Sequence, residues 1–186
     1  SSLVVARSVQ QDKALESALY FDDRFRLTEK ITLEAGIRLS SLFAFGPRNV
    51  AVYDPTVSRE MSSVVDTLEY RRGELYRTWG GPEYRLSVNF MTGDNSSIKV
   101  NYNRTRQYLH LLSNTASISP TDNWKLSDNY LKPQSGDQYA LGFYQLLFKG
   151  RVETSVEFYY KSLKNLIDFK GGTRIIMNEH IEQDLV

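Results

Sequence analysis

Hydrophobic and polar residues alternate along several stretches of this chain. Between residues 31 and 39 an apolar side chain occupies every odd position. A period of two gives a β-strand one apolar face, whereas Thr32 and Gly36 disfavour a helix. The same alternation, broken once at Asp23, runs through 15–27, and only residues 28–30 separate the two stretches. We therefore predict a hairpin of two long strands.

Two further hairpins follow the same pattern. One pairs 83–91 with 98–108 around a turn rich in Gly, Asp and Asn, and the other pairs 138–148 with 152–163 around Lys149 and Gly150. With their flanking residues, the three hairpins occupy 15–45, 83–112 and 138–163. The predicted fold is all-β, an antiparallel up-and-down meander.

The connections between these strands alternate in length. The three short turns fall at one end of the predicted sheet, and the long stretches 46–82 and 113–137, interpreted as loops, fall at the other. Outer-membrane barrels sort their turns and loops in this way, and their strands carry one apolar and one polar face. The pattern therefore favours a segment of a transmembrane β-barrel.

A soluble protein remains an alternative. The core of a β-sandwich and a lipid-facing barrel wall select the same residues, so alternation alone does not separate them. The second candidate function is accordingly a surface or secreted β-sandwich that binds carbohydrate through exposed aromatic side chains. It predicts a second sheet over the apolar face.

Composition narrows the possible chemistry. The 186 residues include 23 Lys and Arg against 22 Asp and Glu, so the net charge is +1. A net charge this small produces no electrostatic field that could recruit nucleic acid. There is no cysteine and there are only two histidines, which argues against thiolate chemistry and metal sites. We expect neither a metal nor a cofactor.

No catalytic group of residues is recognisable. His110 lies in an apolar run, where a structural histidine is the simpler interpretation than a general base. Asp22 and Asp23 are adjacent and so point to opposite faces of a strand, which rules them out as an acid and base pair. A barrel enzyme such as a lipase or protease would need a triad or paired acids at the rim. We predict that the protein is not an enzyme.

Aromatic and basic residues of the predicted loops are candidates for ligand contact. Rigid aromatic side chains and arginines dominate binding surfaces. The alternative is that these side chains pack against the rim of the barrel. The candidates are Tyr70, Arg71, Arg72, Trp79 and Trp124.

Several motifs resemble TonB-dependent outer-membrane receptors, particularly the type found in Bacteroides and its relatives. The resemblance covers nearly the whole chain, from about Ala14 to the end, and its first motif is the hairpin of Tyr20–Thr28 and Ile31–Arg38. Its other motifs, similar to the family in order and spacing, are Asn101–Arg104, Gln107–Ser113, Pro120–Trp124, Lys132–Gln134 leading to Gln138–Tyr139 and Gly142, Glu157–Lys161 and Lys164–Asp168.

The resemblance implies a fragment of such a barrel in the bacterial outer membrane, importing an unidentified nutrient with energy from TonB. A complete receptor has a plug domain, a segment that engages TonB and a closing C-terminal strand, and we expect these to lie outside this chain. Membrane lipid and the TonB system are the implied partners. Six strands fall short of the roughly eight of the smallest membrane barrels, so the isolated fragment is expected to self-associate.

Overall fold

A computed structural model describes residues 12–112, 123–168 and 183–184. Within those ranges no helix is long and apolar enough to cross a bilayer. The elements are β1 (Lys13–Arg26), β2 (Ile31–Phe45), β3 (Arg48–Tyr53), the 3₁₀ turn η1 (Met61–Ser63), β4 (Val64–Tyr70), β5 (Leu75–Gly93), β6 (Ser96–Gln107), β7 (Leu109–Leu112), β8 (Asn123–Leu126), β9 (Gln134–Leu147) and β10 (Val152–Lys164).

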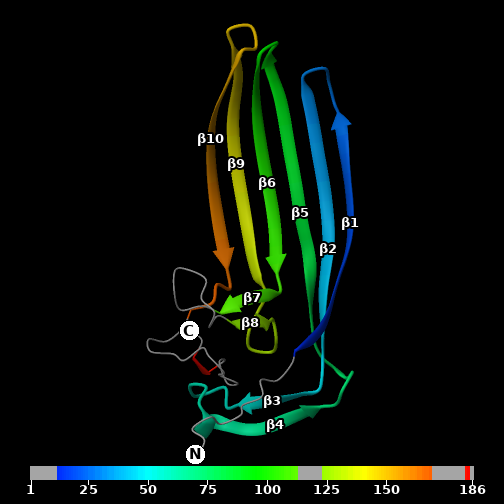
Figure 1. Cartoon of the computed structure of the whole chain (residues 1–186), viewed down its shortest axis with the longest axis vertical. Helices are drawn as coiled ribbons and strands as arrows, with labels where there is room; N and C mark the ends of the chain where they lie inside the picture. Colours follow the sequence, from blue (N-terminus) through cyan, green and yellow to red (C-terminus); the bar gives the residue numbers. More distant parts are fainter. Residues whose placement is uncertain (1–11, 113–122, 169–182, 185–186) are drawn as a thin grey trace, which may run out of the picture.

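Six long strands form one sheet in the order β1-β2-β5-β6-β9-β10, and each neighbouring pair is antiparallel. β3 pairs with β4, and β7 pairs with β8, in two small separate sheets. The three short turns lie at one end of the large sheet, the turn end, and the small sheets lie at the other, the loop end (Figure 1). The antiparallel meander expected from the sequence is confirmed.

Local chemistry explains two of the short turns. After β1, the hydroxyl of Thr28 accepts hydrogen bonds from the backbone N–H groups of Lys30 at 3.2 Å and Ile31 at 3.0 Å. Between β9 and β10, Phe148, Lys149 and Gly150 all have positive φ angles. This left-handed run reverses the chain within four residues, and Gly150 adopts it without steric cost.

The register gives the sheet two distinct faces, because directly opposed residues on antiparallel strands share a face. One row crosses all six strands on the apolar face: Phe25, Leu33, Val88, Val100, Leu141 and Phe158. A neighbouring row crosses the opposite, polar face: Arg26, Thr32, Asn89, Lys99, Gly142 and Glu157.

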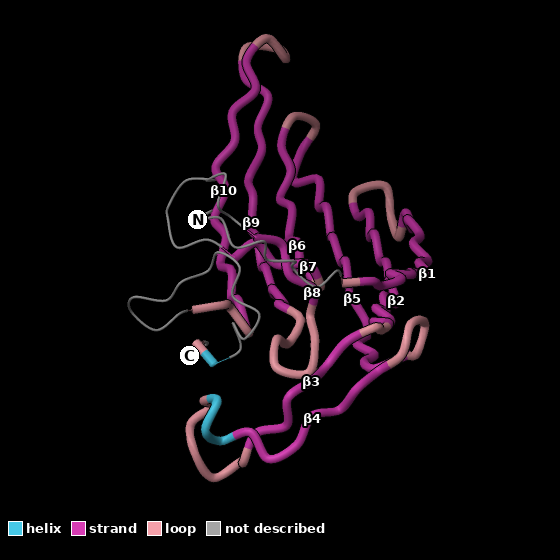
Figure 2. Tube along the Cα trace, turned by 60° about the horizontal axis from the view of Figure 1, so that its bottom comes forward, coloured by secondary structure: helices cyan, strands magenta, loops and turns pink. Residues whose placement is uncertain are grey.

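Among the described residues, no second sheet covers the apolar face. The sheet of β3 and β4 lies clear of the large sheet at its loop end (Figure 2). Phe158, in the middle of β10, is 69% exposed. The second layer that a soluble sandwich requires is therefore not seen in the described part of the chain.

The long connections are more ordered than expected. The stretch 46–82, interpreted as an irregular loop, contains β3, η1, β4 and the first eight residues of β5. The stretch 113–137 contains β8 and the start of β9. Pro82 suggested a loop, but it lies where β5 pairs with β2 only, since the pairing with β6 ends at Arg85. A strand with one free side accommodates a proline.

A small core closes the loop end. Ala44, Val50 and Tyr76 are buried together, and Tyr70 and Tyr130 pack against them. These residues come from β2, β3 and β5 together with the two long connections. The small sheets therefore pack on the end of the large sheet.

Candidate functional site

Asp128 lies at the centre of the contacts at the loop end, where it is only 4% exposed. Its Oδ1 accepts hydrogen bonds from the backbone N–H groups of Tyr130 and Leu131, each at 2.9 Å. Its backbone carbonyl accepts a hydrogen bond from the indole N–H of Trp79 at 3.0 Å. This Asx-type turn holds the segment after β8 against β5.

Two cations neutralise the Asp128 carboxylate. Arg48 Nη2 on β3 lies 2.9 Å from Oδ2, and Lys125 Nζ on β8 lies 3.5 Å from the same oxygen. Arg48 also pairs with Asp12. Burial, the largest single influence, lowers the pKa of Arg48, but Asp12 and Asp128 together hold this pKa above its ordinary value. These ion pairs join the two long connections into one network.

Tyr108, directly after β6, reaches β2 across the intervening β5. Its hydroxyl lies 2.8 Å from Ser40 Oγ and donates to the Ser40 carbonyl at 3.2 Å. Gly81 on β5, which lies opposite Ser40, makes room for the side chain of Arg106. A Cβ on Gly81 would lie 2.7 Å from the guanidinium group of Arg106, so a larger residue there would displace the Arg106 side chain.

His110 fastens β7 to the segment after β8. Its Nε2 lies 2.7 Å from Ser127 Oγ, and the Ser127 N–H donates to the Tyr108 carbonyl at 2.7 Å. Burial lowers the pKa of His110, and Asp128 only partly opposes this effect. At 1% exposure the imidazole is structural, as the sequence pattern indicated.

Three of the predicted ligand-contact residues lie together where β4 ends. Tyr70 contacts the small core, with its ring centroid 5.7 Å from that of Tyr76. Arg71 and Arg72 are exposed in the turn to β5, where the Arg71 N–H donates to Glu74 Oε2 at 2.8 Å. The two arginines are therefore accessible, whereas Tyr70 is partly used in packing.

The two tryptophans have different environments. Trp79 was predicted in a loop, which is wrong: it lies within β5, bonded to Asp128 and with the Arg77 guanidinium 4.2 Å from its ring centroid. Trp124, which was also expected in a loop, lies on the short strand β8 and is 63% exposed. Trp79 is thus fixed by its neighbours, and Trp124 is open to contact.

Sequence patterns do not predict the roles of the residues that organise the loop end, which are Arg48, Asp128, Ser40 and Tyr108. A partial signal exists for Asp128, because the sequence Ser-Asp-Asn favours an Asx turn. The Ser40–Tyr108 contact joins residues 68 positions apart, and no local pattern predicts it.

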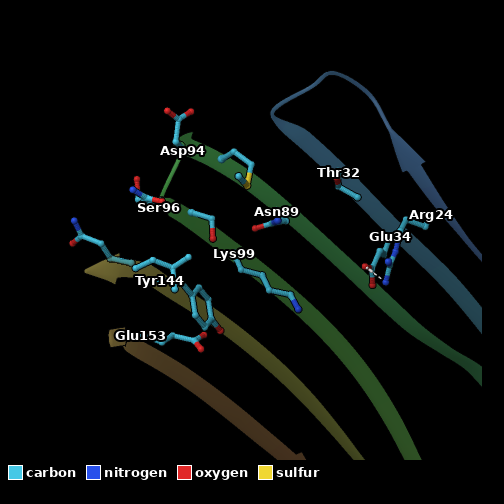
Figure 3. A pocket seen from close by; sticks show the side chains of 14 residues that line it. Arg24, Thr32, Glu34, Asn89, Asp94, Ser96, Lys99, Tyr144 and Glu153 are labelled. Atoms are coloured by element: carbon cyan, nitrogen blue, oxygen red, sulfur yellow. Dashed lines mark ion pairs between the residues drawn. The ribbon is translucent and has the colours of Figure 1, made fainter. Parts of the chain in front are cut away.

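A polar hollow of about 580 Å³ lies on the polar face near the turn end (Figure 3). Arg24 and Glu34, on β1 and β2, form an ion pair at 2.7 Å along one wall. On the other side the Tyr144 hydroxyl donates to Glu157 Oε1 at 2.7 Å. These two pairs place hydrogen-bonding groups on both sides of the hollow. No nucleophile is evident among the residues that line it.

The loop end carries exposed side chains above a network of buried polar groups. Among the described residues, no three His, Cys, Asp or Glu side chains are placed to hold a metal ion. Most buried polar groups around Asp128 and His110 bond to one another or to the backbone, whereas His110 Nδ1 and Asn129 Oδ1 have no hydrogen-bond partner among the described residues. This arrangement stiffens the loop end and leaves exposed aromatic and basic side chains on its surface.

An antiparallel meander with one apolar face, one polar face and loops sorted by end is the architecture of a transmembrane barrel wall. Residues 4–179 match the family described as TonB dependent receptor-like, beta-barrel. The chain belongs to this family. TonB-dependent receptors are transporters, not enzymes. No curated protein matches the chain.

Two solved structures share the fold. One is the alcaligin outer membrane receptor FauA from Bordetella pertussis, with a TM-score of 0.52 and 16% identity over 88% of this chain. The other is the ferric-catecholate import receptor Fiu from E. coli K12, in a closed form, with a TM-score of 0.51 and 14% identity over 87% of this chain. The chain spans 23% of the length of each of these receptors.

Proposed function

We propose that this chain is part of the barrel wall of a receptor that imports a nutrient across the bacterial outer membrane with energy delivered by TonB. The row of apolar side chains that crosses all six strands carries this proposal. Such a row suits contact with lipid, and the opposite polar face suits a watery lumen.

The proposal extends to a longer parent protein of the Bacteroides type. β1 and β10 each pair on one side only within the described residues, and open strand edges do not persist in hydrocarbon. Further strands would close the barrel on both sides. A plug domain and a segment that engages TonB would precede this chain in the parent.

The loop end would form part of the outer surface that captures the nutrient. Exposed Arg71, Arg72 and Trp124 are the contacts we favour there. Alanine at Trp124 should weaken uptake at low nutrient concentration while leaving folding unchanged. Alanine at Trp79, which is bonded to Asp128, should instead loosen the loop end, detectable as faster proteolysis.

Uptake by cells that express the intact receptor tests the proposal. Cells with and without TonB would be offered a panel of radiolabelled iron chelates, a vitamin, oligosaccharides and peptides. We expect at least one compound to accumulate only when both the receptor and TonB are present. Equal receptor-dependent accumulation without TonB would contradict the energised mechanism.

A further inference from the structure

Four charged side chains surround Gly36 on the polar face. Asp22 on β1 and Arg85 on β5 both lie directly opposite Gly36 in the register, one on each side. Arg38 lies two residues further along β2, opposite Glu83. Because Gly36 has no side chain, the four groups border an open space, and they line a cavity of about 480 Å³.

The opposite charges around this cavity do not pair with one another. The side chains of Asp22, Glu83 and Arg85 form no hydrogen bond or ion pair with the described residues, and Arg38 has only a long contact, 3.8 Å, with Glu16. Glu83 is nevertheless only 9% exposed. Opposite charges on neighbouring strands usually stabilise a sheet by pairing, so their separation here requires an explanation.

A bound molecule of complementary charge would explain why these charged side chains do not pair with one another. Glu83 has little contact with water and no charged partner among the described residues, so a cation brought by a ligand would stabilise its carboxylate. The cavity falls within the roughly 300–1,000 Å³ typical of small-molecule sites. It offers carboxylates on β1 and β5 together with guanidinium groups on β2 and β5.

We propose that the cavity around Gly36 binds a small zwitterion, whose ammonium group meets Glu83 and Asp22 and whose carboxylate meets Arg85 and Arg38. The inference rests on the proposed function, since it makes this zwitterion a molecule that the receptor carries. A planar guanidinium group can bind a carboxylate through two parallel hydrogen bonds, which favours a carboxylate over a neutral carbonyl.

Calorimetry on the intact receptor in detergent tests this, with trialanine as the probe. We expect trialanine to bind, and E83Q and R85Q each to weaken its binding by about tenfold, because each removes one charge that faces the zwitterion. N-acetyl-trialanine amide, which lacks both charges, should not bind detectably. K99Q and E153Q are matched controls, because they remove the same kinds of charge in the hollow near the turn end.

Folding is checked separately on gels, by comparing the migration of the receptor in unheated samples with its migration after heating. If E83Q fails to fold, D22N replaces it, since Asp22 is exposed. Three results would overturn the proposal: no binding of trialanine, equal binding of the capped peptide, or binding of maltotriose that E83Q and R85Q abolish. TonB-dependent uptake of another nutrient in the same cells would show that the proposed function stands even then.

Discussion

The hydroxyl group of Tyr108 lies 2.8 Å from that of Ser40, although β5 lies between β2, which carries Ser40, and β6, which ends one residue before Tyr108. Ser40 is 1% exposed, so its hydroxyl has little access to water. The contact folds the chain after β6 over the polar face of the sheet. It therefore ties the chain after β6 to β2.

Replacing Tyr108 by Phe should lower the free energy of unfolding by about 1–3 kcal/mol, because the buried Ser40 hydroxyl loses its partner. Ser40→Ala in the same background should restore part of that loss. Urea unfolding of the single and double variants measures the coupling between the two residues. Additive effects would show that the hydroxyls do not interact.

Asp128→Asn should detach the two small sheets from each other. The variant leaves Asp12 as the carboxylate paired with Arg48 and removes the charge that Lys125 faces on Asp128. Breaking a buried ion pair costs about 3–5 kcal/mol. We expect rapid proteolysis of the loop end while the large sheet stays folded. Asp66→Asn, an exposed carboxylate on β4, is the matched control and should leave the cleavage rate unchanged.

The loop end should open in mild acid. Burial lowers the pKa of His110, so at intermediate pH the unfolded hairpin binds more protons than the folded one. The stability that neutral His110 contributes is complete above the unfolded pKa of about 6.5 and is lost as the pH falls toward the lower folded pKa. Protease sensitivity of β7 and β8 measured from pH 7.5 to 5 should rise.

His110→Gln provides the control for this pH dependence, since the amide keeps a hydrogen-bonding group near Ser127 but does not titrate in this range. The variant should flatten the rise in sensitivity. If it retains the full pH dependence of the wild type, another group must control the opening.

Leu33→Arg should destabilise the intact receptor in vesicles by about 2–4 kcal/mol if Leu33 lies near the bilayer midplane, because a charge on the lipid face is costly there. Thr32→Arg places the same charge on the polar face one residue away and should cost far less. Equilibrium unfolding from vesicles compares the two. Similar losses for both variants would mean that the faces are wrongly assigned.

The long strands were predictable because each repeats its pattern over many residues. Ile31, Leu33 and Ile37 alternate with polar neighbours, and a shift of one residue would reverse every side chain between lipid and lumen. The short turns were equally visible, since they fall between two such runs. Periodicity therefore determined the order and pairing of all six long strands.

The structure of the loop end could not be predicted from periodicity in this way. β3 and β4 are only six and seven residues long, too short for alternation to stand out, and Pro82 made the first half of β5 look irregular. Asp128 and Arg48 are separated by 80 positions. Their contact depends on how the long strands bring the two connections together, which a local pattern does not encode.

Spin labels placed one residue at a time along β2 in the intact receptor, reconstituted in vesicles, test most directly whether this sheet is a barrel wall. Labels at residues 31, 33, 35 and 37 should collide with oxygen dissolved in lipid, and labels at 32, 34 and 36 with a water-soluble nickel complex. This alternation with a period of two is the result that the structure predicts. Access of the nickel complex to both sets alike would contradict it.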